Sequence, residues 1–326
     1  MAGTFRLPRP REFSTRGCTM KISVGLPTHH VDSPDEWCTA EAITEMARAT
    51  ERAGADAVFV TDHPAPDVKF MAKGGHHALD PFVALTVAST ATTSLRLHFN
   101  LAILAYRNPF ISAKAIATLD LISNGRVIIG TGAGYLAPEF AAVGGDFDQR
   151  NDVTDESIRA MKAIWSGEPV TMSGLHFEAV ETIALPLPVQ LPSPPIWIGG
   201  NSNRAIRRSV ELADGWNPMP SPARASRMLR TPPIETIEDL ERRIGDLGAA
   251  SEKAGREIPP EVIFTPIGYD LFSGSFPDAA KFVDDIAAYS AIGVSTLTIN
   301  LPGDTRAQWI ESVEWLGSEV IANIDA

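Results

Sequence analysis

From residue 20 onward, short apolar runs alternate with longer segments whose apolar residues recur at helical spacing. Short, nearly continuous apolar runs are typical of strands buried on both faces of a parallel sheet. A period of about 3.6 residues is typical of amphipathic helices. The runs predict eight strands, at 22–26, 57–60, 95–104, 127–130, 195–198, 215–219, 262–269 and 296–301.

The segments between these runs predict helices, some with recognisable ends. Asp80 and Asn108 each precede a proline, the order expected of an N-cap and a first helical residue, and Gly54 is placed to end a helix. Helices are predicted at 40–54, from 80 onward, and at 108–125, 152–165, 202–213, 236–254, 279–293 and 308–324. Turn residues and prolines at 170–188 predict an inserted hairpin, and the proline- and arginine-rich segment 220–233 predicts a mobile loop.

This order of elements predicts an α/β fold, namely a (β/α)8 TIM barrel with an insertion between strands four and five. Residues 20–326 would form this single domain. The alternative is an open doubly wound sheet, which would want a glycine fingerprint after the first strand. That strand instead runs into Leu26-Pro-Thr-His-His30. Residues 1–19 have no apolar core of the kind a signal peptide needs, so we expect a disordered extension.

Composition narrows the function classes. A net charge of −12 argues against nucleic-acid and anionic-membrane partners, which require a basic face. The two cysteines, Cys18 and Cys38, give neither a disulfide framework nor a repeated metal-ligand spacing. No apolar stretch approaches the roughly 18 residues of a transmembrane helix. We therefore expect a cytoplasmic enzyme acting on a small molecule.

Two titratable side chains follow the second predicted strand. Asp62 and His63 would lie at the mouth of a barrel, where active sites form. Histidine exchanges protons near neutral pH, and Asp62 would orient the imidazole or hold a ring nitrogen of a cofactor. The alternative is purely structural, with Asp62 capping a turn and His63 packing under the loop.

Glycine-rich turns follow the fourth and fifth predicted strands. The first is Gly130-Thr-Gly-Ala-Gly-Tyr135, and the second is Gly199-Gly-Asn-Ser202, which opens a helix. Such turns leave amides pointing outward, and helix N-termini favour anions. Two of them at one end of a barrel suggest a single elongated ligand with a phosphate. Alternatively each is a flexible connection, and Arg204, Arg207 and Arg208 are a solvated face.

The other histidines carry less information. His29, His30, His76 and His77 can all face the mouth, so a metal-dependent lyase is an alternative, but no ligand spacing supports a metal site. His98, inside the third predicted strand, is expected in the core. No serine stands in a nucleophile elbow, so acyl transfer has no support.

Five motifs together resemble the luciferase-like monooxygenases, and most closely their F420-dependent oxidoreductase branch. They span residues 101–109, 117–126, 129–135, 195–202 and 211–218, which read LAILAYRNP, ATLDLISNGR, IGTGAGY, PIWIGGNS and ELADGWNP. The likeness runs from about Met20 to the C-terminus.

The resemblance implies which residues bind the cofactor, F420 or alternatively FMN. Its phosphate would lie against the glycine turns, its ring against Asp62, and a non-prolyl cis peptide would fall within residues 100–102. The implied set comprises Asp62, Asn100, Leu101, Ala102, Gly132, Ala133, Gly134, Gly199, Gly200, Asn201 and Ser202.

The resemblance also implies the chemistry. His63 would be the proton donor or acceptor for hydride transfer between F420 and a small organic substrate. Tyr135 stands where the F420-dependent glucose-6-phosphate dehydrogenase has a catalytic glutamate, so that substrate is not expected. Glu139, one helical turn on, is expected to point along its helix. Leu104 and Trp216 would give the mouth an apolar wall. The family implies a homodimer, and a separate flavin or F420 reductase is a candidate partner. Alternatives are an FMN-dependent monooxygenase and a non-catalytic cofactor-binding protein.

Overall fold

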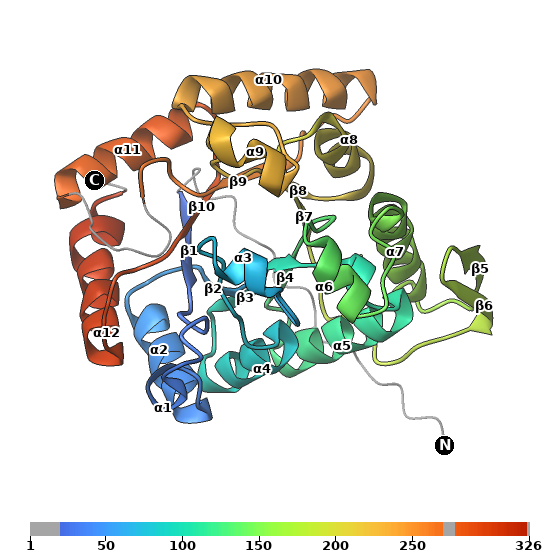
Figure 1. Cartoon of the computed structure of the whole chain (residues 1–326), viewed down its shortest axis with the longest axis horizontal. Coiled ribbons are helices and arrows are strands. Elements are labelled where there is room, and N and C mark those ends of the chain that lie inside the picture. Colours follow the sequence, from blue (N-terminus) through green and yellow to red (C-terminus); the bar gives the residue numbers. More distant parts are fainter. Residues whose placement is uncertain (1–19, 270–277, 325–326) are drawn as a thin grey trace.

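The computed structural model describes residues 20–269 and 278–324, apart from the side chains of 228 and 229, and shows a closed barrel (Figure 1). The barrel strands pair in the order β1-β10-β9-β8-β7-β4-β3-β2, and all their pairings are parallel. The predicted TIM barrel is confirmed, and the open sheet is excluded. The barrel strands are β1 (Lys21–Gly25), β2 (Ala57–Val60), β3 (Arg96–Ala102), β4 (Val127–Thr131), β7 (Ile196–Gly199), β8 (Gly215–Asn217), β9 (Glu261–Phe264) and β10 (Thr296–Ile299).

The helices surround the strands, as the colours of Figure 1 show from blue to red. Side chains cap most of the longer helices: Asp80 accepts from the amides of Phe82 and Val83, and Asn108 accepts from Phe110 and Ile111. The helices are α1 (Pro34–Trp37), α2 (Ala40–Arg52), α3 (Val68–Met71), α4 (Pro81–Ala91), α5 (Pro109–Ile122), α6 (Ala137–Ala142), α7 (Arg150–Ile164), α8 (Asn203–Leu212), α9 (Ala223–Leu229), α10 (Ile237–Lys253), α11 (Ala279–Ala291) and α12 (Arg306–Trp315). In the ranges described, no helix is long and apolar enough to cross a membrane.

The insertion between the fourth and fifth barrel strands contains the predicted hairpin, made of β5 (Val170–Gly174) and β6 (Phe177–Thr182). Other predictions were wrong in detail. The segment 220–233 contains helix α9, β8 and β9 stop short of residues 219 and 269, and the last helix changes at Leu316 to a π-turn. Residues 1–19, expected to be disordered, lie outside the described part of the chain.

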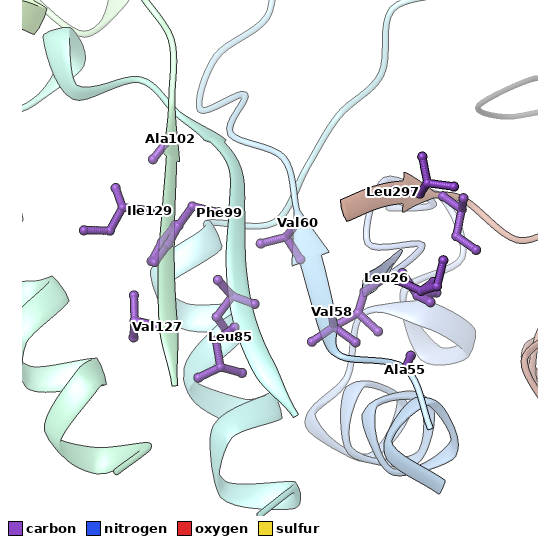
Figure 2. Close-up of a cluster of buried hydrophobic side chains, with 14 of the residues drawn as sticks. Leu26, Ala55, Val58, Val60, Leu85, Phe99, Ala102, Val127, Ile129 and Leu297 are labelled. Atoms are coloured by element: carbon purple, nitrogen blue, oxygen red, sulfur yellow. The ribbon is translucent and has the colours of Figure 1, made fainter. Parts of the chain in front are cut away.

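The core lies between the strands and the helices. Figure 2 shows this packing around β2, β3 and β4, where Val58, Val60, Phe99 and Ile129 are buried. Burying such side chains contributes roughly 1.5–3 kcal/mol each, before the entropy cost of ordering the chain. His98 is in the core as expected, with its Nδ1 hydrogen-bonded to the Ser23 hydroxyl at 3.2 Å. The apolar interior fixes which residues end each strand, and so which ones reach the rim.

Candidate functional site

The two glycine turns lie side by side at one rim of the barrel. Strand β4 pairs with β7 in parallel, with Thr131 opposite Ile198, so both turns leave the sheet at the same level. Gly134 and Gly200 have left-handed backbone angles, with φ of 77° and 105°. A β-carbon at Gly134 would lie 2.7 Å from the Phe140 ring, so only glycine fits there without movement.

The first turn has unused hydrogen-bond donors. Within the described ranges, the amides of Ala133, Gly134 and Tyr135 make no hydrogen bond to the protein. The same holds for Asn203 and Arg204 at the start of α8, where the helix dipole favours an anion. The residues present therefore fit a phosphate group between the first turn and the N-terminus of α8.

The second turn is less available than the sequence suggests. The Asn201 amide donates to the Thr231 hydroxyl at 2.8 Å, and its side-chain nitrogen donates to the carbonyls of Met219 and Pro232. Asn201 is fully buried, so its polar groups brace the loop. Ser202 caps α8 by accepting from the Ala205 amide at 3.1 Å. Gly199 and Gly200 thus contribute mainly by letting a ligand approach the backbone closely, and less by offering hydrogen-bond donors.

A cis peptide joins Asn100 to Leu101 at the end of β3, within the expected residues 100–102. The Asn100 side-chain oxygen accepts a hydrogen bond from Asn217 Nδ2 on β8 at 2.9 Å. The Leu101 side chain occupies the space where a β-carbon of Gly199 would lie, and Ala102 is buried. These contacts tie the end of β3 to β7 and β8.

Both oxygens of Asp62 are engaged within the protein. The Arg107 guanidinium donates to them at 2.6 and 2.9 Å, and the Ile103 amide donates at 3.0 Å. Burial by itself lowers the pKa of Arg107, but the hydrogen bonds to Asp62 outweigh it and raise the pKa above its ordinary value. Asp62 therefore fastens the segment that follows β3. Its assignment as a cofactor contact stays a prediction.

His63 is held by a buried carboxylate. Its Nδ1 lies 3.2 Å from Glu139 Oε2, which also accepts from the Tyr106 hydroxyl at 2.7 Å, and Glu139 Oε1 accepts from the Ala65 amide at 3.0 Å. The Glu139 side chain is only 1% exposed. The expectation that it points along its helix was wrong, because α6 is short and turns this residue toward β2.

The charge on Glu139 determines which histidine nitrogen carries a proton. Burial alone would raise the pKa of Glu139, but the hydrogen bonds from His63, Tyr106 and Ala65 outweigh it and hold the pKa below its ordinary value. An ionised carboxylate can only accept, so His63 Nδ1 must donate. Neutral His63 then has its lone pair on Nε2. Among the residues described, no side chain or amide hydrogen-bonds to Nε2.

Aromatic and imidazole rings surround His63. The rings of His76, Phe70 and Tyr135 lie 4.8, 5.2 and 6.2 Å from it, centroid to centroid. Burial, and then the charge of Glu139, raises the pKa of Tyr135 to about 12, so its hydroxyl stays protonated. Burial and neighbouring histidines lower the pKa of His76 to about 3.

Three of the histidines expected at the mouth lie close to one another. His29 lies 4.1 Å from His30 and 6.3 Å from His76, centroid to centroid. Burial lowers the pKa of His29 to about 4, so it is neutral at pH 7. No group of three metal-ligating side chains occurs in the part of the chain that the structure covers.

The predicted apolar wall of the mouth was wrong. Leu104 and Trp216 are 1% and 0% exposed, so both belong to the core. The Trp216 indole nevertheless donates to the Gly200 carbonyl at 2.9 Å, which connects it to the second glycine turn. It is thus placed to respond to a ligand at that turn.

Sequence reasoning overlooked Tyr106 and Arg107 and misjudged Glu139. The first two lie in the short segment after β3, which ends at Ala102, and position near a strand end is a signal that was already used for Asp62 and His63. The Glu139 contact spans 76 residues of chain. No local pattern carries that information.

Residues 20–259 match the family model described as luciferase-like monooxygenase. An F420-dependent glucose-6-phosphate dehydrogenase from Amycolatopsis mediterranei is 29% identical over 180 residues, covering 53% of this chain and 52% of that protein. An FMNH2-dependent dimethylsulfone monooxygenase from Pseudomonas putida is 28% identical over 199 residues, covering 60% and 52%. The coenzyme F420-dependent tetrahydromethanopterin reductase of Methanopyrus kandleri has the same fold, with a TM-score of 0.71 and 17% identity over 94% of this chain and 99% of that one.

Proposed function

The chain belongs to the luciferase-like monooxygenase family, and from this premise we propose that it is an F420-dependent oxidoreductase that transfers hydride to or from a small organic substrate. The family includes relatives that use F420 and relatives that use FMN. The observation that carries the proposal is the array of His63, Glu139 and Tyr106, which prepares one histidine nitrogen for proton transfer.

The cofactor would be held by the backbone of this chain. The free amides of Ala133, Gly134 and Tyr135 and the N-terminus of α8 would bind its phosphate. The cofactor's ring would lie against Gly199, where the backbone can be approached closely, and against residues 100–102. When bound, a deazaflavin supplies a two-electron hydride carrier, and the protein contributes orientation and electrostatics.

His63 would move the proton that accompanies the hydride. In oxidation of an alcohol, the C–H bond gives up a hydride, and the hydroxyl proton passes to His63 Nε2. In the reverse direction Nε2 returns that proton to the carbonyl oxygen. Glu139 would stabilise the imidazolium that forms, since it accepts from Nδ1 in either state. General acid–base catalysis of this type contributes about 10²–10⁴-fold to a rate.

Tyr135 would orient the substrate. Its hydroxyl remains protonated at neutral pH because its pKa is about 12, so it can donate a hydrogen bond to a substrate oxygen but cannot serve as a base. The relative that oxidises glucose 6-phosphate shows that the family accepts sugar phosphates. Because Tyr135 stands where a glutamate is expected for that reaction, we propose a different substrate.

Titration of the purified protein with F420 and with FMN tests the proposal. We expect saturable quenching of tryptophan fluorescence by F420 and substrate-dependent bleaching of the F420 absorbance. His63→Ala should keep F420 binding and lose turnover about 10²-fold or more. His77→Ala, at an exposed histidine, is the control. Binding of FMN alone with oxygen consumption would overturn the proposal, and so would tight F420 binding without any bleaching.

A further inference from the structure

Two arginines stack on one aromatic ring beside the first glycine turn. The guanidinium carbons of Arg150, at the start of α7, and Arg230, at the end of α9, lie 4.0 and 4.7 Å from the centroid of the Phe147 ring. Arg230 is exposed and Arg150 half-buried. Cation–π contacts of this kind hold guanidiniums in place but do not neutralise them.

These two charges lack carboxylate partners. Within 20–269 and 278–324, neither arginine has an ion pair within 4.0 Å, and Arg150 Nε is buried without a hydrogen bond. Burial, and then the nearby charge of Arg230, lowers the pKa of Arg150, although Asp148 opposes this. The positive end of α7 adds to the same potential. The arrangement leaves two guanidiniums without an ion pair to any described residue, on a chain whose net charge is −12.

The arginines of α8 differ from Arg150 and Arg230 because they have carboxylate partners. Arg204 and Arg208 both pair with Asp155, so their charges are compensated within the protein. Arg208 is only 3% exposed. The expectation that these side chains form a solvated face is therefore wrong for Arg208. Only Arg207, paired with Glu211 at 3.9 Å, is largely exposed.

The uncompensated pair is connected to the proposed phosphate site. The Phe147 ring packs against Phe140 at 5.4 Å, and Phe140 packs under Gly134, whose β-carbon position is 2.7 Å from that ring. Phe140 is itself fully buried, so the two rings form an apolar support beneath the surface. This support places Arg150 and Arg230 two ring contacts away from the first turn, within reach of a chain that continues from a phosphate bound there.

We propose that Arg150, Arg230 and Phe147 bind an acidic extension of the cofactor beyond its phosphate, that is, a chain bearing carboxylates. This inference rests on the proposed function and deepens it. F420 continues past its phosphate into a lactyl-glutamate tail, whereas FMN ends at the phosphate. The two guanidiniums would thus favour F420 over FMN by an interaction remote from the ring.

Binding of three probes tests the inference without any turnover. Tryptophan fluorescence would follow titration with F420 that carries its glutamates, with the same deazaflavin phospholactate without glutamates, and with FMN. The variants are Arg150→Gln/Arg230→Gln and, as a matched control, Arg207→Gln. For the double variant, we expect the Kd of tailed F420 to rise about tenfold, equal to about 1.4 kcal/mol. The form without glutamates keeps only its lactate carboxylate, so its Kd should rise less, and raised salt should remove the difference.

The outcomes separate this inference from the proposed function. If wild type binds tailed and tailless F420 equally well, and the double variant changes neither, the arginine pair is only a solvated surface and the inference fails alone. Equal weakening of all three probes would show a general structural loss, which also overturns it. Arg150→Lys/Arg230→Lys keeps the charge and should retain most of the preference. If wild type binds no F420 at all, the proposed function fails as well.

Discussion

Replacing Glu139 by glutamine tests how the site controls its histidine. The carboxylate accepts three hydrogen bonds, from His63 Nδ1, the Tyr106 hydroxyl and the Ala65 amide. Glutamine has the same shape but one oxygen and one NH2 group. The Ala65 amide can only donate, so it must take the oxygen. The NH2 group then faces Tyr106 and His63, both of which can change from donor to acceptor.

The consequence is a change of tautomer. In Glu139→Gln, His63 Nδ1 accepts a hydrogen bond, so the imidazole proton moves to Nε2. The nitrogen that accepts the substrate proton in the wild type then carries a proton already. The variant therefore lacks the base needed to oxidise an alcohol, although its cavity and packing are preserved.

The magnitude follows from the contacts. Hydrogen bonds to a charged group contribute about 1.5–3 kcal/mol, against about 0.5–1.5 kcal/mol for neutral ones. Three bonds lose roughly 1 kcal/mol each, so the variant should unfold more easily by about 3 kcal/mol. The rate effect is larger, because loss of general base catalysis costs about 10²–10⁴-fold. We expect kcat for alcohol oxidation to fall by at least about 10²-fold, with little change in F420 affinity.

NMR of the imidazole nitrogens distinguishes the two tautomers directly. The chain has 7 histidines, so comparison with His63→Ala assigns the signal. Tyr106→Phe is the matched control, since it removes one donor but keeps the carboxylate, and it should retain the Nδ1–H tautomer. If Glu139→Gln keeps Nδ1–H on His63 and normal kcat, the carboxylate does not orient the histidine.

Three further predictions concern the supports of the site. Arg107→Ala leaves the 1% exposed carboxylate of Asp62 unpaired, which should cost about 3–5 kcal/mol by urea unfolding; a loss below about 1 kcal/mol would mean that solvent screens the pair. Gly134→Ala imposes a φ of 77° on an L-residue and crowds Phe140, which should cost about 1–2 kcal/mol and weaken phosphate binding; unchanged unfolding would refute this. Partial burial by itself would raise the pKa of Glu51, but hydrogen bonds from the turn before β3 lower it from 4.5 to about 2. The stabilisation that ionised Glu51 gives to the folded state is complete above its ordinary pKa of 4.5 and is lost as the pH falls toward about 2. Glu51→Gln should therefore lower Tm at neutral pH but hardly at about pH 2, and an equal loss of Tm at both pH values would contradict this.

The strands could be predicted because each is buried on both faces, which leaves a nearly continuous apolar run in the sequence. Their ends were less certain. Residues such as Ile267 and Tyr269 pack against the core without pairing, so the apolar pattern continues past the end of β9. Helix α9 was missed because prolines, which are typical of loops, stand on both sides of it, although Pro222 directly precedes the helix as its N-cap.

The candidate site likewise has parts that could be predicted from the sequence and parts that could not. The glycine turns and His63 are recognisable because position at the end of a barrel strand is local information. The partners of His63 depend on how far α6 and the segment after β3 lean over the mouth. That geometry results from packing between β2, β3 and β4, so Tyr106 and Glu139 could be assigned only from the structure.

The segment between β4 and α7 links three parts of the proposed reaction. The first residues of this segment offer amides for a phosphate. Glu139, in the short helix α6, orients His63. The Phe147 ring, near the end of the segment, stacks against Arg150 and Arg230. Phe140 packs against both Gly134 and Phe147, so these parts share one apolar support. A cofactor that settles against the amides and the arginines would therefore also hold the helix that presents Glu139. Binding at the phosphate would then stabilise the histidine in the tautomer that accepts a proton, which couples recognition of the cofactor's tail to chemistry at its ring.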